Sequence, residues 1–388
     1  MCIISVATLC TLMLELSCRR GTAGRSRPAP HSSVPVVICW YMAWGHQRRK
    51  WDENATECCN VASCGRPEVT VPSTGAAAHP LVALTGATGF IGQHLLRELP
   101  RRGVRLRVLL RRPSEVPIES ASAVIGDLAR PQNMAAALAG VDAVIHSAGI
   151  AHAMSGLPED DYRMLNTEAT IQLARAARRA GVKRFVFLSS VRAQSGPTAE
   201  RVLTEDLAPQ PTDAYGRSKL AAERGLAELD LDWVALRLPL MFGRGVKGNM
   251  EALVRLARSP YPLPFSGLRG KRSLLSVQNL VGAIAAVLTL PFPLQRPFIV
   301  ADPEPLSIAE MVTALRRGLG RRAGLVPVPP KLLALGLAVL GRGEIYQRLA
   351  GSLVADPSAL MKLGWTPQLM TRDALAALAR ATADTSSE

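Results

Sequence analysis

The sequence predicts an α/β protein with a doubly wound parallel sheet and a smaller C-terminal domain. From residue 81 onward, apolar runs of strand length alternate with segments of helical periodicity, and a glycine-rich turn joins the first strand to the first helix. This alternation is typical of parallel sheets covered by helices on both faces. The chain of 388 residues is long enough for two domains. We expect a leader at 1–78, the sheet domain at 79–245, and 246–388 mostly as a substrate-binding domain.

The first 78 residues differ in composition from the remainder. All seven cysteines and three of the five tryptophans lie there, without helical or strand periodicity. The apolar run 1–14 is too short for a membrane span and lacks the positive start of a signal peptide. The odd cysteine count and irregular spacing fit neither a disulfide nor a metal module. We expect a disordered leader or an extension upstream of the true start, with an anchor or targeting segment and a cysteine module as alternatives.

Composition limits the partners of residues 79–388. This part contains no cysteine, which suits a cytoplasmic location. It holds 38 Lys and Arg against 26 Asp and Glu, but the basic residues are spread along the chain and few aromatics accompany them. That pattern argues against nucleic acid. It favours anionic small molecules such as diphosphates, or an acidic membrane surface. We predict no metal site.

The turn after the first strand has the spacing of a dinucleotide fingerprint, with Gly86, Gly89 and Gly92. The first glycine permits a tight turn, the second lets backbone approach a pyrophosphate, and the third lets helix and strand pack closely. The phosphates would bind at the helix N-terminus, where Phe90 and Ile91 carry free N–H groups.

Residues 104–110 form the next predicted strand, whose end faces the adenosine ribose in a dinucleotide-binding fold. A carboxylate there would bind the ribose hydroxyls of NAD and repel a 2′-phosphate. Here Leu110 and Arg111 occupy this place, which favours NADP over NAD with Arg111 as the phosphate partner. The alternative is an arginine that is merely solvated.

Residues 123–125 are expected to form a short buried strand, followed by Asp127 and Leu128. Asp127 could accept a hydrogen bond from the adenine amino group, or could cap the following helix, which is the commoner role. The strand 141–146 leads to Ala148, a small residue where backbone passes close to the cofactor.

Two histidines, His146 and His152, could suggest a catalytic base near this point. We expect a packed or hydrogen-bonded histidine instead. A helix over 161–180, ending at Gly181, and a buried strand over 184–188 complete the alternation.

The chemistry is expected at Tyr215 and Lys219, four residues apart in a predicted helix over 214–229. This spacing places both side chains on one face. An ammonium beside a phenol favours the phenolate and suits it to acid/base catalysis near neutral pH. Ser190, or Ser189 before it, could orient a substrate hydroxyl.

As a set, these motifs resemble the extended short-chain dehydrogenase/reductase family, the nucleotide-sugar epimerases and dehydratases, from about residue 81 to at least 280. The resemblance implies a Rossmann-type fold and a homodimer. It implies that Tyr215 is the acid/base, that Lys219 also holds the nicotinamide ribose, and that Ser190 assists at the reacting carbonyl. It also assigns the adenine contact to Asp127 and Leu128.

The last third bears on the substrate. Residues 242–249, ending at Asn249, resemble the loop that folds over a nucleotide-sugar, and Arg272 matches the family arginine that binds a nucleotide diphosphate. An arginine fork suits phosphate oxygens, although a solvated surface arginine is the alternative. Residues 332–340 are apolar nearly all round and too short to span a bilayer. We expect this segment to be buried, with a membrane-lying helix as the alternative.

One departure from the family pattern refines the predicted function. Dehydratases of the family carry Asp-Glu after the catalytic Ser or Thr, whereas Val191 and Arg192 follow Ser190 here. The resemblance is greatest to bacterial epimerases acting on N-acetylhexosamines linked to UDP or undecaprenyl diphosphate. We expect an NAD(P)-dependent epimerase of a nucleotide-activated or lipid-diphosphate-linked sugar, working through a 4-keto intermediate. The alternatives are an NADPH-dependent reductase or hydroxysteroid-type dehydrogenase, and a non-catalytic NAD(P)-binding subunit.

Overall fold

The computed structural model describes residues 79–115, 120–150, 157–339, 341 and 343–384. The chain separates into Met1–Ala77 and Ala78–Glu388, and the second unit carries the fold. The predictions for the leader and for His152 lie outside the described residues.

A seven-stranded parallel sheet forms the centre of this unit, in the order β10-β6-β5-β4-β1-β2-β3. The order runs outward in both directions from β1 and β4, which creates the crevice where doubly wound sheets bind ligands. Its strands are β1 Leu81–Thr85, β2 Arg105–Leu110, β3 Ala121–Val124, β4 Ala143–His146, β5 Arg184–Ser190, β6 Trp233–Leu238 and β10 Arg296–Ile299. The predicted α/β fold class is confirmed.

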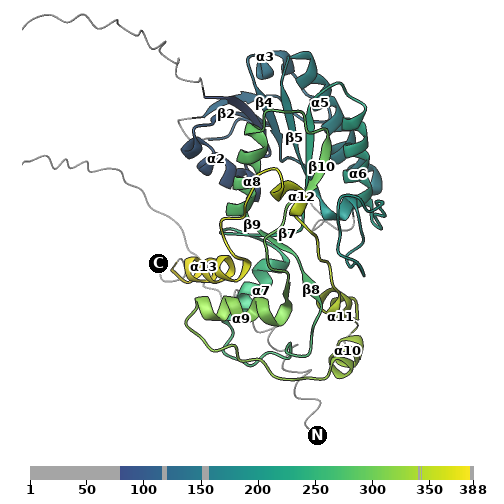
Figure 1. Cartoon of the computed structure of the whole chain (residues 1–388), viewed down its shortest axis with the longest axis vertical. Coiled ribbons are helices and arrows are strands. Elements are labelled where there is room, and N and C mark those ends of the chain that lie inside the picture. The colour runs from purple at the N-terminus through teal and green to yellow at the C-terminus, as the bar shows by residue number, and fades with distance from the viewer. Residues whose placement is uncertain (1–78, 116–119, 151–156, 340, 342, 385–388) are drawn as a thin grey trace, which may run out of the picture. The chain divides into compact units, whose positions relative to one another are not determined.

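Helices cover both faces of the sheet (Figure 1). Val82 and Leu84 of β1 pack in the cluster beneath one pair of helices, while Ala83 packs in the opposite cluster. Because alternate residues face opposite sides and both sides are covered, the central strands are apolar throughout. The first face carries α2 Phe90–Glu98 and α8 Val277–Thr289, and the second carries α3 Met134–Leu138, α5 Ala169–Arg179 and α6 Ala214–Ala227.

Smaller elements follow β6 and form a third apolar cluster. They include two short strand pairs, β7 with β9 and β8 with β11. The sheet strand β10 and helix α8 also come from beyond residue 245. The remaining elements are η1 Pro100–Arg102, α4 Glu159–Tyr162, the π-helical turn η2 Arg163–Glu168, η3 Val191–Ala193, β7 Leu240–Phe242, α7 Asn249–Arg258, β8 Lys271–Arg272, β9 Leu274–Ser276, β11 Leu306–Ser307, α9 Ile308–Gly318, α10 Pro330–Val339, α11 Gly343–Ala350, α12 Ser358–Met361 and α13 Thr371–Asp384.

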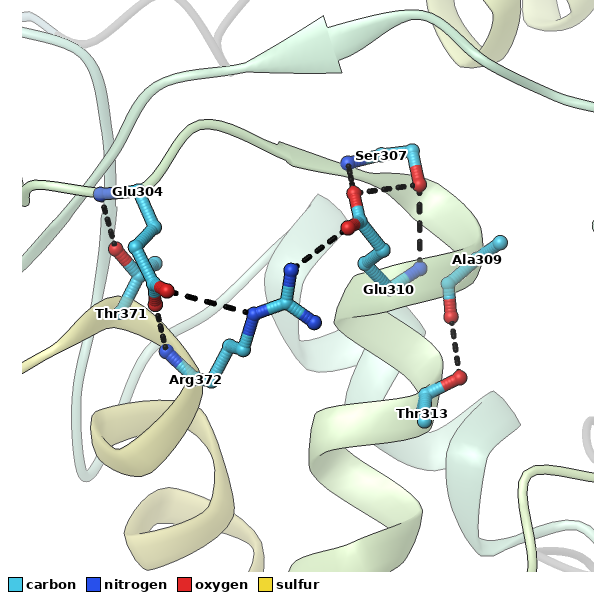
Figure 2. Close-up of polar contacts among 7 residues, drawn as sticks. All are labelled: Glu304, Ser307, Ala309, Glu310, Thr313, Thr371 and Arg372. Carbon is cyan, nitrogen blue, oxygen red and sulfur yellow. Dashed lines mark hydrogen bonds and ion pairs between the residues drawn. The ribbon is translucent and has the colours of Figure 1, made fainter.

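A capping box begins α9, as the Ser307/Glu310 spacing predicts (Figure 2). The Ser307 hydroxyl accepts the Glu310 N–H, and the Glu310 carboxylate accepts the Ser307 N–H at 2.9 Å. Arg372 at the start of α13 donates to the same carboxylate at 2.7 Å and pairs with Glu304. The N-termini of α9 and α13 are thereby joined.

Two packing predictions are wrong. For the strand predicted at 123–125 this holds in part: β3 lies at the sheet edge and is exposed along most of its length, whereas Ile125 directly after it is buried and Ala123 is partly buried. The helix α10 was expected in the core, yet the structure describes all of its residues and none is buried. It packs on α11 and leaves its other side uncovered. Within the described residues, no helix is both long and apolar enough to cross a bilayer.

Candidate active site

The β1–α2 turn forms a cradle for a diphosphate. Gly86 has a φ of +71°, and a Cβ there would lie 2.6 Å from the Ala148 nitrogen. A Cβ on Gly92 would lie 2.1 Å from the Gly86 carbonyl oxygen, so neither position tolerates a side chain. Gly89 is the N-cap of α2 without a capping side chain, and the first turn holds no acidic residue. These features fit the pyrophosphate of a dinucleotide, held by the N–H groups of Phe90 and Ile91.

A buried hydrogen-bond chain fixes the β4 side of this cradle. Thr85 Oγ1 lies 2.7 Å from His146 Nδ1, and His146 Nε2 lies 3.0 Å from Thr170 Oγ1. Because Thr170 donates its proton to the Asn166 carbonyl, it accepts from His146, which assigns the proton to Nε2. Thr85 then donates to Nδ1 and accepts the Ala148 N–H at 3.3 Å. His146 is a hydrogen-bonded core residue, as expected, and burial lowers its pKa to about 3, aided by the charge of Lys219.

The predicted adenosine contacts lie at the carboxyl ends of β2 and β3. Arg111 follows β2 directly and is exposed, and Leu128 is partly buried against the apolar cluster beside α3. The Asp127 carboxylate accepts the Ala129 N–H at 3.0 Å. It does not cap the following helix, because α3 begins only at Met134 with Asn133 as its N-cap.

The two serines at the end of β5 have different partners. Ser189 donates to the Glu223 carboxylate at 2.5 Å, and Glu223 is itself paired with Arg237 in the core. Ser190 accepts the Arg192 N–H at 3.2 Å, and its hydrogen bond to Tyr215 lowers the pKa of that phenol. The structure therefore selects Ser190 as the candidate catalytic serine.

The helix α6 brings Tyr215 and Lys219 to this point. Asp213 is its N-cap and accepts the Gly216 N–H at 2.7 Å, which fixes where the helix begins. Lys219 is buried, and its ammonium donates to the Leu188 carbonyl at 2.9 Å. Burial lowers the pKa of Lys219 to about 8, against the opposing charge of Glu223.

The pKa of the Tyr215 phenol is raised in this structure. Desolvation raises its pKa most strongly, the Ser190 hydrogen bond lowers it, the Asp213 carboxylate raises it and the Arg192 guanidinium lowers it. The residue nevertheless keeps some exposure, so the ring remains open to a ligand. A ligand that brings positive charge or expels Asp213 would favour the phenolate.

Arg192 is a site residue whose role the sequence interpretation missed. Its guanidinium pairs with the Asp213 carboxylate, and its side chain is 11% exposed. Its Nε is buried without a hydrogen-bond partner among the described residues. The charge of Arg192 acts on both Tyr215 and Arg272, so Arg192 lies close enough to influence both side chains. The sequence signal that could have identified Arg192 is its basic side chain two residues after Ser190.

Asn166 is a second missed residue. Its side chain accepts the Ile150 N–H at 2.8 Å and donates to the Ser218 hydroxyl at 3.1 Å. A Cβ on Gly149 would lie 2.8 Å from Asn166 Oδ1 and 3.5 Å from Lys219 Nζ, so this loop passes directly over both. The π-helical turn that aims Asn166 has no sequence signature of the kind that a cap or a glycine turn has.

The two predicted substrate residues lie on different elements. Asn249 is exposed at the first position of α7. Arg272 on β8 donates to the Pro197 carbonyl at 3.2 Å and to the Arg348 carbonyl at 2.7 Å. Burial and the charge of Arg192 lower the pKa of Arg272. Their contact with a substrate stays a prediction.

This fold and site define a class: a dinucleotide-binding doubly wound domain that presents a serine, a tyrosine and a lysine beside its cofactor crevice. The model of the NAD dependent epimerase/dehydratase family matches residues 82–300, and the chain belongs to that family. It is therefore an NAD(P)-dependent enzyme of the epimerase/oxidoreductase class, as the sequence motifs indicated.

Three known proteins show what the chain is similar to. A UDP-glucose 4-epimerase of Vibrio cholerae is 33% identical over 74% of this chain and 90% of its own length. A 3 beta-hydroxysteroid dehydrogenase/Delta 5-->4-isomerase of Mycobacterium tuberculosis is 30% identical over 69% of this chain and 75% of its own. The structure of MoeE5 in complex with UDP-glucose and NAD is 27% identical, with a TM-score of 0.62, over 78% of this chain and 99% of that one.

Proposed function

We propose that the protein is a 4-epimerase of a sugar carried on a diphosphate, either a nucleotide-activated or a lipid-diphosphate-linked sugar. The observation that supports this most is the convergence of Ser190, Tyr215 and Lys219, with Arg192 in place of the acidic pair of dehydratases. The likeness to a UDP-glucose 4-epimerase points the same way.

Each residue has a definite task in this mechanism. Ser190 orients the sugar 4-hydroxyl, and Tyr215, once ionised, accepts its proton. A nicotinamide cofactor bound in the crevice would supply reversible hydride transfer at C4, so that the 4-keto sugar could be reduced again from its other face. Lys219 would hold the nicotinamide ribose, and Tyr215 would give the proton back to the 4-oxygen. The overall reaction is redox-neutral, because the sugar regains both the proton and the hydride that it gave up.

The experiment is to incubate the purified full chain with UDP-N-acetylglucosamine and, separately, UDP-glucose, and to follow the 4-epimer by NMR. We expect epimer with at least one of them, and none with Tyr215→Phe. No epimer with either sugar, together with NADPH oxidation in the presence of a ketone, would favour the second candidate. That candidate, a reductase or hydroxysteroid-type dehydrogenase, draws on the mycobacterial relative. If Tyr215→Phe and the wild type cannot be distinguished in any of these assays, a non-catalytic subunit is favoured.

We also propose a preference for NADP over NAD, because Arg111 and no carboxylate follows β2. Fluorescence titration with both nucleotides tests this, and tighter binding of NAD would contradict it. A homodimer and a cytoplasmic location complete the proposal, which light scattering and cell fractionation can test.

A further inference from the structure

The helix α10 presents an apolar face that the described residues leave uncovered. Leu332, Leu335 and Val339 are 50%, 62% and 80% exposed. Their spacing of three and four residues places them on one side of the helix. Lys331 is the single charged residue of Pro330–Val339, so the exposed side of the helix is apolar. An exposed apolar stripe of this kind often marks an interaction surface.

Exposed cations lie on and near α10. Lys331 is exposed on the helix itself, and Arg348 is exposed on the contacting helix α11. The loop of Arg269 and Lys271, both exposed, lies beside α10 and α11, because Gly267 backs onto Pro330 and Gly270 onto Ala350. Exposed apolar side chains with exposed cations near them are features that the surface of an anionic bilayer can bind.

Helix α10 is linked to the candidate active site through α11. Figure 1 shows α10 beside α11, and the two helices are in contact. The Arg348 carbonyl of α11 accepts a hydrogen bond from Arg272, the predicted diphosphate-binding side chain. One helix therefore separates the uncovered face from the position proposed for the substrate diphosphate.

We propose that α10 docks on an anionic membrane surface, with Leu332, Leu335 and Val339 among the lipid headgroups, and that it brings the site to a sugar whose diphosphate is carried on a lipid. The choice of lipid carrier rests on the proposed epimerase function; the docking does not. A second copy of the chain is a poorer occupant, because stable interfaces bury roughly 800 Å² per partner, more than three side chains supply.

The docking test is flotation of the full chain with vesicles of phosphatidylglycerol and phosphatidylcholine, or of phosphatidylcholine alone. We expect binding to the anionic vesicles, weakened by 0.5 M NaCl because salt screens the cations. The triple variant Leu332→Ser, Leu335→Ser, Val339→Ser should bind at least tenfold less. The matched control is Val202→Ser with Phe292→Ser, two exposed apolar residues elsewhere. This control should bind like the wild type.

Two results would overturn the docking: a wild type that does not float with anionic vesicles, or a triple variant that floats equally well. A triple variant that changes from dimer to monomer in light scattering would assign the face to a second copy. The carrier is tested with an isoprenyl-diphosphate-linked N-acetylhexosamine in the same vesicles. We expect kcat/KM on it to fall at least tenfold in the triple variant and to stay unchanged on the UDP-sugar. Flotation without activity on any sugar would remove the proposed function and leave the docking.

Discussion

At the hydroxyl of Tyr215, three side chains set the reactivity of one phenol. The hydrogen bond between Ser190 and the phenol lowers the pKa of Tyr215, the charge of Arg192 also lowers it, and the charge of Asp213 raises it. Burial outweighs the two favourable effects, so the pKa of the phenol lies above its usual value. A ligand that brings positive charge beside the hydroxyl would favour the phenolate.

Replacing Tyr215 by Phe removes only the reacting oxygen. We expect kcat to fall by about 10²- to 10⁴-fold, the usual contribution of a general acid/base, with nucleotide affinity unchanged. Steady-state kinetics and nucleotide titration measure the two quantities. Tyr162→Phe is the matched control, because its ring lies 6.3 Å from that of Tyr215. A control that loses as much activity would show that the loss is not specific to the Tyr215 hydroxyl, which would contradict its role as the acid/base.

The charge of Arg192 predicts how kcat/KM depends on pH. Removing its charge in Arg192→Gln raises the pKa of Tyr215, so the acidic limb of the kcat/KM profile should move to higher pH. Arg192→Lys keeps the charge and should restore the limb toward its original position. If both variants lower activity equally at every pH, Arg192 acts only by holding Asp213 at the start of α6.

At the scale of elements, the helix termini carry both function and stability. The uncapped N-terminus of α2 is left open for a phosphate, whereas α6 and α9 are capped by their own side chains. A helix end without a cap at a ligand crevice is consistent with a ligand that supplies the missing acceptors. The capped ends fix the start of their helices instead.

The α9 capping box permits a stability prediction (Figure 2). Ser307→Ala should lower the free energy of unfolding by about 1 kcal/mol, because the Glu310 N–H loses its acceptor. Arg372→Ala should cost less, since its ion pairs are 44% exposed on the arginine side and water screens them. Urea unfolding of both variants measures this. A larger loss for Arg372→Ala would mean that the link between α9 and α13 matters more than the cap.

At the scale of the whole molecule, the buried hydrogen-bond chain through His146 ties the sheet to α5. It runs from the loop after β4 through Thr85 and His146 to Thr170 and the Asn166 carbonyl. It needs a neutral imidazole, because Nδ1 must accept a hydrogen bond from the Thr85 hydroxyl. The fold is thus coupled to pH at a residue that does no chemistry.

The sign of this coupling follows from the pKa of about 3 for His146 in the folded protein, against 6.5 for a free side chain. The unfolded chain binds the proton more readily, so this stabilisation is complete above pH 6.5 and is lost as pH falls toward 3. Between pH 6.5 and 5 the loss should be about 2 kcal/mol, at about 1.4 kcal/mol per pH unit.

Urea unfolding from pH 7.5 to 4.5 tests this, with His146→Asn as the variant that cannot titrate. The wild type should lose stability more steeply than the variant. The buried Asp302, whose pKa burial raises to about 6, opposes the trend below pH 6 but is common to both proteins. His94→Asn is the control and should keep the wild-type slope. Parallel slopes for His146→Asn and wild type would contradict the prediction.

Much of this molecule could be predicted from the sequence by itself, because the relevant signals are local. The Gly86–Gly92 spacing, the alternating strands and the Ser307/Glu310 cap depend on residues within a few positions of each other. The tyrosine and lysine share a helix face because four residues make about one turn. These features determined the fold class and the type of enzyme.

The tertiary structure decided what depends on contacts between distant segments. It separated Ser190 from Ser189, because Glu223 from α6 binds the latter. It brought Arg192 near both Tyr215 and Arg272, and the Gly149 loop against Asn166. It also left α10 uncovered, against the expectation of burial. An apolar run indicates that burial of the segment is favourable. Whether the segment is buried within the protein depends on which elements pack against it, and that is decided by the tertiary structure.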